Sequence, residues 1–171
     1  MKKVSLFLIS LLLLLSVKAQ TTFTAGSLKV SFDKQANFTE IIYTNSGVNY
    51  LYKDTLAPFI TLISNQKRVL PQSFKYDIAR NVITLTYAEI KAKVEVKVIP
   101  RPTHIPFEVI KAEPAVKIEG LIWGAVPTTI SKVIGEIIGV VRNNEVGFGI
   151  QVLNPKTLGG EYNTEGMTWS R

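Results

Sequence analysis

The side chains that could do metal chemistry are scarce in this sequence. The chain of 171 residues holds a single histidine, His104, and no cysteine. Zinc and iron sites in proteins need several nitrogen or sulfur ligands, so we expect no such metal and no cofactor. A calcium site built from carboxylates and carbonyls stays open, although no loop is rich in aspartate.

Nucleophilic catalysis by a serine triad would have to use His104. This residue lies in a proline-rich connection, and no Gly-x-Ser-x-Gly elbow accompanies it. We therefore interpret His104 as a loop or sheet-edge residue.

Glycoside hydrolysis needs two carboxylates that face one sugar. Glu95 alternates with valines that we expect to be buried, so its side chain should point outward. Other carboxylates fall in expected turns, where structural roles are common. A third group lies in or beside apolar strands. Burial there would raise the pKa of a carboxyl group, which would suit a catalytic general acid. An ordinary hydrogen-bonded glutamate is nevertheless the favoured interpretation. The turn group is Asp33, Asp54, Asp77 and Glu145, and the strand group is Glu108, Glu119 and Glu136. We assign no catalytic residue.

Trp123 is the aromatic residue best suited to contact a sugar. Its indole offers a flat apolar face and an N–H donor, which serve a core and a sugar ring equally well. Its apolar neighbours Leu121 and Ile122 favour the core. Arg101 and His104 could line the same sheet edge and donate hydrogen bonds to hydroxyl groups. Trp123, His104 and Arg101 are thus the candidate carbohydrate-binding residues.

Two short patterns resemble acceptors for covalent glycans. Asn37-Phe38-Thr39 fits the N-glycan pattern. Asp54-Thr55-Leu56 resembles the acceptor for O-glycans on some exported bacterial proteins. Patterns of three residues are common by chance, so both are weak signals.

The elements that would position these residues are strands. In residues 94–98, apolar and charged side chains alternate, which predicts a half-buried strand with Val94, Val96 and Val98 on one face. Prolines interrupt pairing after it, and alternation resumes at residues 107–109. Similar runs recur roughly every eight to twelve residues with turn residues between them, and no helical period is sustained. The sequence predicts an all-β, antiparallel sandwich of two sheets.

Three further hairpins are expected. They join residues 28–32 with 38–43, residues 74–78 with 82–87, and residues 137–141 with 148–152. Asn143-Asn144 suits a two-residue turn in the last one. Both of its strands are almost continuously apolar, so we expect both of its faces to be covered. Close backbone approach or a β-bulge is expected at Gly135, Gly139, Gly147 and Gly149.

The N-terminus predicts export. Lys2 and Lys3 precede an apolar run over residues 4–17, and Ala19 ends the segment, as in a secretory signal peptide. The run is shorter than the roughly 20 residues needed to span a bilayer, so an uncleaved membrane anchor is the less favoured alternative. Cleavage after Ala19 would leave 152 residues, enough for one domain, with 17 basic and 13 acidic side chains. That mild surplus is spread singly, so we expect a periplasmic or extracellular protein without a nucleic-acid or membrane partner.

The C-terminal residues have no clear period. Residues 20–155 are expected to form the sandwich, whereas residues 156–171 are rich in glycine and end near the apolar Trp169. Compact domains seldom close on such a segment. We therefore expect the sandwich to be incomplete and to continue beyond Arg171.

The order of these features resembles a known domain type. The resemblance rests on several segments in a fixed order. They are the opening hairpin, Asn49-Tyr50-Leu51, the strands of residues 94–109, Trp123-Gly124, and residues 127–130, 135–142 and 149–160. They are similar to the N-terminal β-supersandwich, galactose-mutarotase-like domain of large secreted bacterial glycoside hydrolases. The resemblance implies a non-catalytic portion of a carbohydrate-active enzyme that supports a catalytic domain in cis and contacts polysaccharide. A stand-alone glycan-binding module and a structural, partner-binding β-protein remain alternatives.

Overall fold

The computed structural model describes residues 20–134, 139–154, 157, 161–162 and 168–169. Within these ranges the regular structure is antiparallel strands and two short 3-10 helices, η1 (Ala88–Ile90) and η2 (Ala115–Lys117). The all-β prediction is therefore confirmed. The expected signal peptide lies outside the described residues. In the part that is described, no helix is long and apolar enough to cross a membrane.

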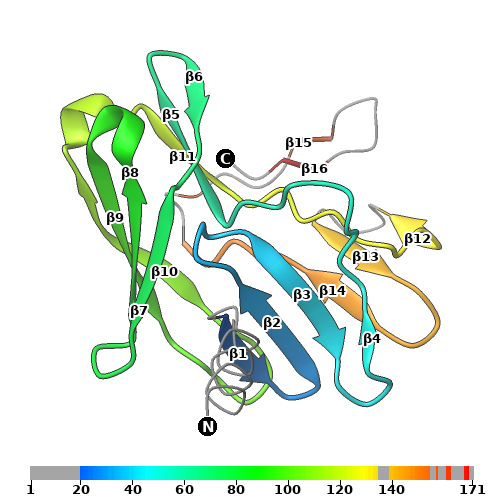
Figure 1. Cartoon of the computed structure of the whole chain (residues 1–171). Coiled ribbons are helices and arrows are strands. Elements are labelled where there is room, and N and C mark those ends of the chain that lie inside the picture. The colour runs from blue at the N-terminus through cyan, green and yellow to red at the C-terminus, as the bar shows by residue number, and fades with distance from the viewer. Residues whose placement is uncertain (1–19, 135–138, 155–156, 158–160, 163–167, 170–171) are drawn as a thin grey trace, which may run out of the picture.

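Two four-stranded sheets form most of the molecule (Figure 1). The first sheet follows chain order and contains β1 (Thr21–Ala25), β2 (Leu28–Phe32), β3 (Phe38–Tyr43) and β4 (Val48–Asn49). The second has the order β10-β9-β8-β7 and contains β7 (Ser73–Asp77), β8 (Val82–Tyr87), β9 (Ala92–Val98) and β10 (Phe107–Glu113). The predicted hairpins β2–β3 and β7–β8 are confirmed.

Smaller sheets complete the fold. One has the order β11-β5-β6 and contains β5 (Ile60–Ser64), β6 (Lys67–Val69) and β11 (Gly120–Trp123). Another contains β12 (Val133–Ile134), β13 (Val140–Arg142) and β14 (Gly147–Gly149). A final pair joins β15 (Glu161–Tyr162) to β16 (Thr168–Trp169).

The expected burial of β8 and β9 is observed. Val94, Val96 and Val98 are at most 1 % exposed, and Ile83, Leu85 and Tyr87 are fully buried. The hydroxyl of Tyr87 donates a hydrogen bond of 3.0 Å to the carbonyl of Ile60, which joins β8 to β5. Burial raises the pKa of the Tyr87 hydroxyl far above its ordinary value, so the tyrosine stays a neutral donor.

The core is centred on Phe32, at the end of β2. Its ring lies 6.5 Å or less, between centroids, from five other phenylalanine rings. These rings come from both large sheets and from the segment before β5: Phe23, Phe38, Phe59, Phe74 and Phe107. Edge-to-face packing dominates, as the quadrupoles of aromatic rings prefer. The first and second sheets therefore share one aromatic core, in the manner of a sandwich.

The last predicted hairpin differs from its expectation in two ways. Arg142 pairs with Gly147, and the amide of Asn143 donates to the carbonyl of Val146, so the turn is centred on Asn144 and Glu145. The reason is that the Asn143 side chain accepts hydrogen bonds from the amides of Glu145 and Val146 and so caps the turn.

The faces of that hairpin are not covered as predicted. Val140, Val141 and Phe148 are only half-buried, and Ile150 is 48 % exposed. The close approach expected at two glycines is confirmed, since a Cβ on Gly139 would lie 2.8 Å from the Ile150 carbonyl oxygen and one on Gly149 would lie 2.8 Å from Val140. Gly147 has only ordinary contacts, and residues 135–138 lie outside the described ranges.

Glu119 holds the turn between β5 and β6. Asn65 and Gln66 form that turn with positive φ angles of 48° and 60°, as a type I′ hairpin turn requires. The two carboxylate oxygens of Glu119 accept hydrogen bonds from the amides of Asn65 (2.7 Å) and Gln66 (3.0 Å). Glu119 is therefore a structural cap from a distant part of the chain.

We predict that Phe32→Ala lowers the free energy of unfolding by roughly 3–5 kcal/mol, because it removes the ring on which five others pack. Denaturant unfolding followed by fluorescence measures the change. Val116→Ala, at a side chain that is 92 % exposed, is the control and should change stability by less than about 0.5 kcal/mol. Equal effects of the two substitutions would contradict a core centred on Phe32.

We also predict that Glu119→Ala destabilises the protein by about 1–3 kcal/mol, since two charge-assisted hydrogen bonds are lost. Amide hydrogen exchange should accelerate most at Asn65 and Gln66. Exposed Glu108→Ala, a glutamate in β10, is the control and should leave exchange in this turn unchanged. Unchanged exchange at residues 65 and 66 in Glu119→Ala would rule out the capping role.

Candidate functional site

The first candidate site is the tip of the β9–β10 hairpin. Beyond the paired strands, the amide of Ile99 donates to the carbonyl of Pro106 and the amide of Arg101 donates to that of His104, both at 3.0 Å. Pro100 occupies the alternate position, where an N–H would point away from the partner strand, and Pro102 lies in the turn that the Arg101–His104 hydrogen bond closes. The hairpin therefore continues past its last regular pair, and prolines stiffen it.

This tip presents polar donors to solvent. Arg101, Thr103 and His104 are exposed, and the hydroxyl of Thr103 lies 3.0 Å from Nδ1 of His104. The tip also rests on the β1–β2 turn, where a Cβ on Gly26 would lie 3.2 Å from the carbonyl oxygen of Pro102. The structure thus brings two of the predicted carbohydrate-binding residues, Arg101 and His104, together on one anchored loop.

Trp123, the third predicted residue, belongs to a different sheet. It ends β11, pairs with Ile60 and is half-buried. Its ring lies 5.7 Å from that of Phe59 at an angle of 69°, so one side of the indole packs on the aromatic core. A role of Trp123 in sugar contact stays a prediction, and the packing supplies its structural function.

A second polar cluster crosses the first sheet. The hydroxyl of Ser31 lies 2.9 Å from that of Thr22 and donates to Oε2 of Glu40 at 3.0 Å, while Nζ of Lys29 lies 2.9 Å from the same oxygen. Ser31 is fully buried, so no substrate can reach its hydroxyl. The hydrogen bond from Lys29 holds the pKa of the Glu40 carboxyl below its usual value, with help from Ser31 and against the opposing effect of burial. The cluster ties three strands together.

The sequence did not reveal this cluster because its members alternate with apolar residues and meet only through strand register. Thr22 pairs with Ser31, and Ser31 pairs with Glu40. The hairpin expected between residues 28–32 and 38–43 contained the signal, since cross-strand partners share a face.

Lys29→Met is predicted to weaken the acid sensitivity of the fold. Because the folded pKa of Glu40 lies below its unfolded value, the stability it contributes is present above the usual glutamate pKa of 4.5 and is lost as pH falls below that value. Unfolding free energies measured from pH 6 to pH 3 should therefore fall less steeply in Lys29→Met than in the parent chain. Lys53→Met, at an exposed lysine outside the cluster, should keep the parental slope. Identical slopes in all three proteins would contradict the assignment.

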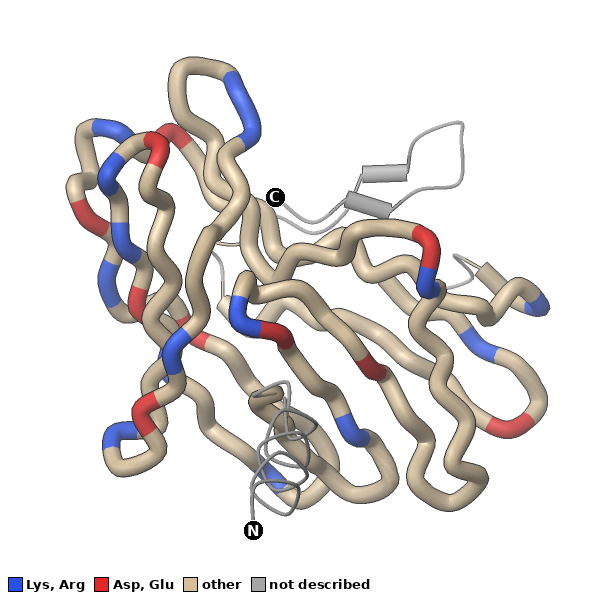
Figure 2. The backbone as a smooth tube through the Cα atoms, in the orientation of Figure 1, with Lys and Arg blue, Asp and Glu red and all other residues tan. Residues whose placement is uncertain are grey.

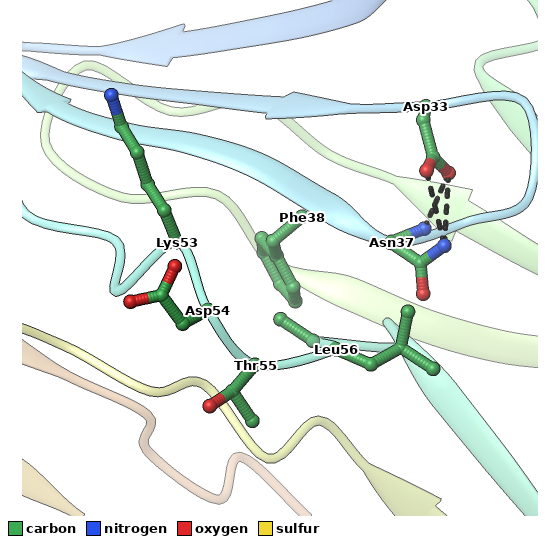
Figure 3. A pocket seen from close by; sticks show the side chains of 8 residues that line it. Asp33, Asn37, Phe38, Lys53, Asp54, Thr55 and Leu56 are labelled. Atoms are coloured by element: carbon green, nitrogen blue, oxygen red, sulfur yellow. Dashed lines mark hydrogen bonds between the residues drawn. The ribbon is translucent and has the colours of Figure 1, made fainter.

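A shallow hollow of about 340 Å³ lies beside the first sheet (Figure 3). Phe38 stands between its two walls. One wall is the β2–β3 turn with Asp33 and Asn37, and the other is the loop of residues 53–57. Asp33 accepts hydrogen bonds from the amides of Gln35 and Asn37 and from the Asn37 side chain, so its carboxylate is committed to the turn.

Most of the carboxylates that make contacts within the described residues have structural roles. Asp33, Asp77 and Glu119 cap turns, and Glu40 belongs to the strand cluster. Glu95 lies 3.8 Å from Arg80, and Glu113 lies 3.0 Å from Lys111. Within the described ranges, no group of three or more histidine or acidic residues could hold a metal ion. Figure 2 shows basic and acidic residues interspersed along the backbone, and both kinds occur together on the sheet of β7–β10.

Comparisons of the chain with protein-family models, with curated proteins and with solved structures found no match. The residues and geometry described above are therefore the basis for assigning a role.

Proposed function

We propose that this chain is a non-catalytic β-sandwich portion of a secreted carbohydrate-active enzyme, a glycoside hydrolase. It supports the catalytic domain and contacts oligo- or polysaccharide through the β9–β10 tip. The observation that carries the proposal is the stiff, exposed loop on which Arg101 and His104 stand together.

Such a tip suits sugar hydroxyls. The guanidinium of Arg101 offers five N–H donors in a fixed plane, and the imidazole of His104 offers a donor and an acceptor. Because two backbone hydrogen bonds and two prolines already order the loop, binding costs less conformational entropy than it would on a flexible one. An open surface of this kind favours weak contact with a long polymer over deep enclosure of a small molecule.

A supporting role is favoured by the disposition of charge and apolar surface. Asp33 and Asp77 of the described chain cap turns and Glu95 lies beside Arg80, so these three carboxylates already have structural roles. Glycoside hydrolysis needs a facing pair of carboxylates, which we expect the catalytic domain to supply. Large apolar side chains remain exposed around β12–β14, where Ile134 is 50 %, Ile150 48 % and Leu153 66 % exposed. Exposed apolar groups of this kind suit contact with another domain.

A stand-alone glycan-binding module is the second candidate, because the tip alone would suffice for it. The coding sequence downstream of Arg171 separates the two. An open frame that continues into alternating strands and helices with paired carboxylates supports the enzyme portion. A stop codon overturns that part of the proposal and leaves the glycan-binding module.

Arg101→Ala combined with His104→Ala should weaken binding to the recognised polysaccharide at least about tenfold, which corresponds to roughly 1.4 kcal/mol. A panel of microbial, plant and host polysaccharides screened with residues 20–171 identifies the ligand, and calorimetry measures the affinity. Arg80→Ala, at an exposed arginine in the β7–β8 turn, is the matched control and should bind as the parent does.

The double variant should melt at the parental temperature, since both side chains are exposed. Full binding by the double variant would reject the tip as the contact site. Absence of binding to every polysaccharide in the panel would favour a structural, partner-binding protein.

A further inference from the structure

Residues 52–57 form an irregular segment whose two ends are fixed. Leu51 pairs with Thr128 and Pro58 pairs with Asn37, each through an isolated bridge. Leu51 and Ala57 are buried, and the carbonyl of Ala57 accepts a hydrogen bond of 2.8 Å from the amide of Phe38. The intervening residues 52–56 are all exposed, so the segment is an anchored, outward-facing loop.

Asp54 is the unusual aspartate of this loop. The other two aspartates of the described chain, Asp33 and Asp77, both accept hydrogen bonds from backbone amides in their own turns. Asp54 also lies in a turn, but its carboxylate has no hydrogen-bond or ionic partner among the residues that the structure describes. Its carboxylate therefore makes no stabilising contact with the described part of the fold.

The next two residues are equally unengaged. The hydroxyl of Thr55 has no partner within the described ranges, and Figure 3 shows its side chain directed away from Asp33 and Asn37. Leu56 is 58 % exposed, although burial of a leucine side chain is favourable. Three consecutive residues of this loop thus present a free carboxylate, a free hydroxyl and an exposed leucine side chain, to which a second protein could bind.

We propose that Thr55 is the acceptor of an O-linked glycan, with Asp54 and Leu56 as the flanking residues that the modifying transferase reads. The donor is a sugar carried on a diphosphate. Oγ1 of Thr55 forms a bond to the anomeric carbon, and the bond from that carbon to the diphosphate oxygen breaks. The diphosphate leaves with the bonding electron pair, and the hydroxyl proton passes to a base of the transferase. The proposal does not depend on the function proposed above.

The other glycan-acceptor pattern, Asn37-Phe38-Thr39, is a poor site by the same criteria. The side-chain nitrogen of Asn37 donates a hydrogen bond of 3.0 Å to Asp33, and the residue is half-buried and bridged to Pro58. Modification of Asn37 would break the turn that follows β2. The structure therefore separates two patterns that the sequence leaves equal.

The test is mass spectrometry of the protein isolated from the organism that encodes it. Trypsin cleavage after Lys53 and Lys67 releases residues 54–67, which also contain Thr61 and Ser64. Those two side chains are only 7 % and 5 % exposed and act as internal controls. We expect a hexose- or hexosamine-containing mass on this peptide, and fragmentation by electron transfer should place it on Thr55.

Variants expressed in the same organism define the recognition. Thr55→Val and Asp54→Asn should lose the added mass, Thr55→Ser should keep it, and Thr103→Val, at an exposed threonine outside the pattern, should leave it unchanged. Any of three results would overturn the proposal. The native protein could carry no glycan on Thr55, the glycan could lie on Thr61 or Ser64 instead, or it could persist in Asp54→Asn. Equal melting temperatures of the variants exclude misfolding as the cause of a loss.

Discussion

The packing of Phe32 against five other phenylalanine rings is the interaction on which this fold depends. The chain has no cysteine and therefore no disulfide, so burial of apolar surface must offset the conformational entropy of folding. Rings from β1, β2, β3, β7 and β10 meet in one cluster, which places the two large sheets face to face. Aromatic side chains suit this task because each buries a large area with few rotatable bonds.

The same cluster positions the polar loops. Phe59 contacts Phe32, Phe107 and Trp123, so it connects the core to the start of β10 and the end of β11. The β9–β10 tip therefore ends one residue before a core ring, at Pro106. The turn that Asp33 caps begins one residue after Phe32. The polar loops lie on short connections whose ends are tied to buried aromatic residues, which keeps these connections ordered without disulfides.

The sequence predicted what local pattern determines. Alternation identified β8 and β9 and their buried faces, and turn residues identified the hairpins β2–β3 and β7–β8. The sequence pattern did not predict contacts between distant segments. Three such contacts depend on strand register or sheet order. They are the pairing of β11 with β5, the cap that Glu119 places on a turn more than 50 residues earlier, and the Lys29–Ser31–Glu40 cluster. The turn at Asn144 was misplaced by one residue because a side-chain cap, and not asparagine's tolerance of positive φ, decides it. The backbone hydrogen bond between Arg101 and His104 places these two candidate residues side by side. The exposure of Thr55 on an anchored loop was visible only in the structure, because distant bridges fix the ends of that loop.

The spacing of prolines after β9 also bears on how the molecule avoids self-association. Past Val98, the outward edge of this hairpin is no longer covered by β8, because the last β8–β9 pair joins Val82 to Lys97. Free edges of this kind offer N–H groups on which a strand from another molecule can assemble. Pro100 occupies the outward position and has no N–H to offer, Pro102 lies in the turn, and the inward amides of Ile99 and Arg101 are used within the hairpin. The residues that stiffen the polar tip thus also leave it without a template for intermolecular β-sheet growth.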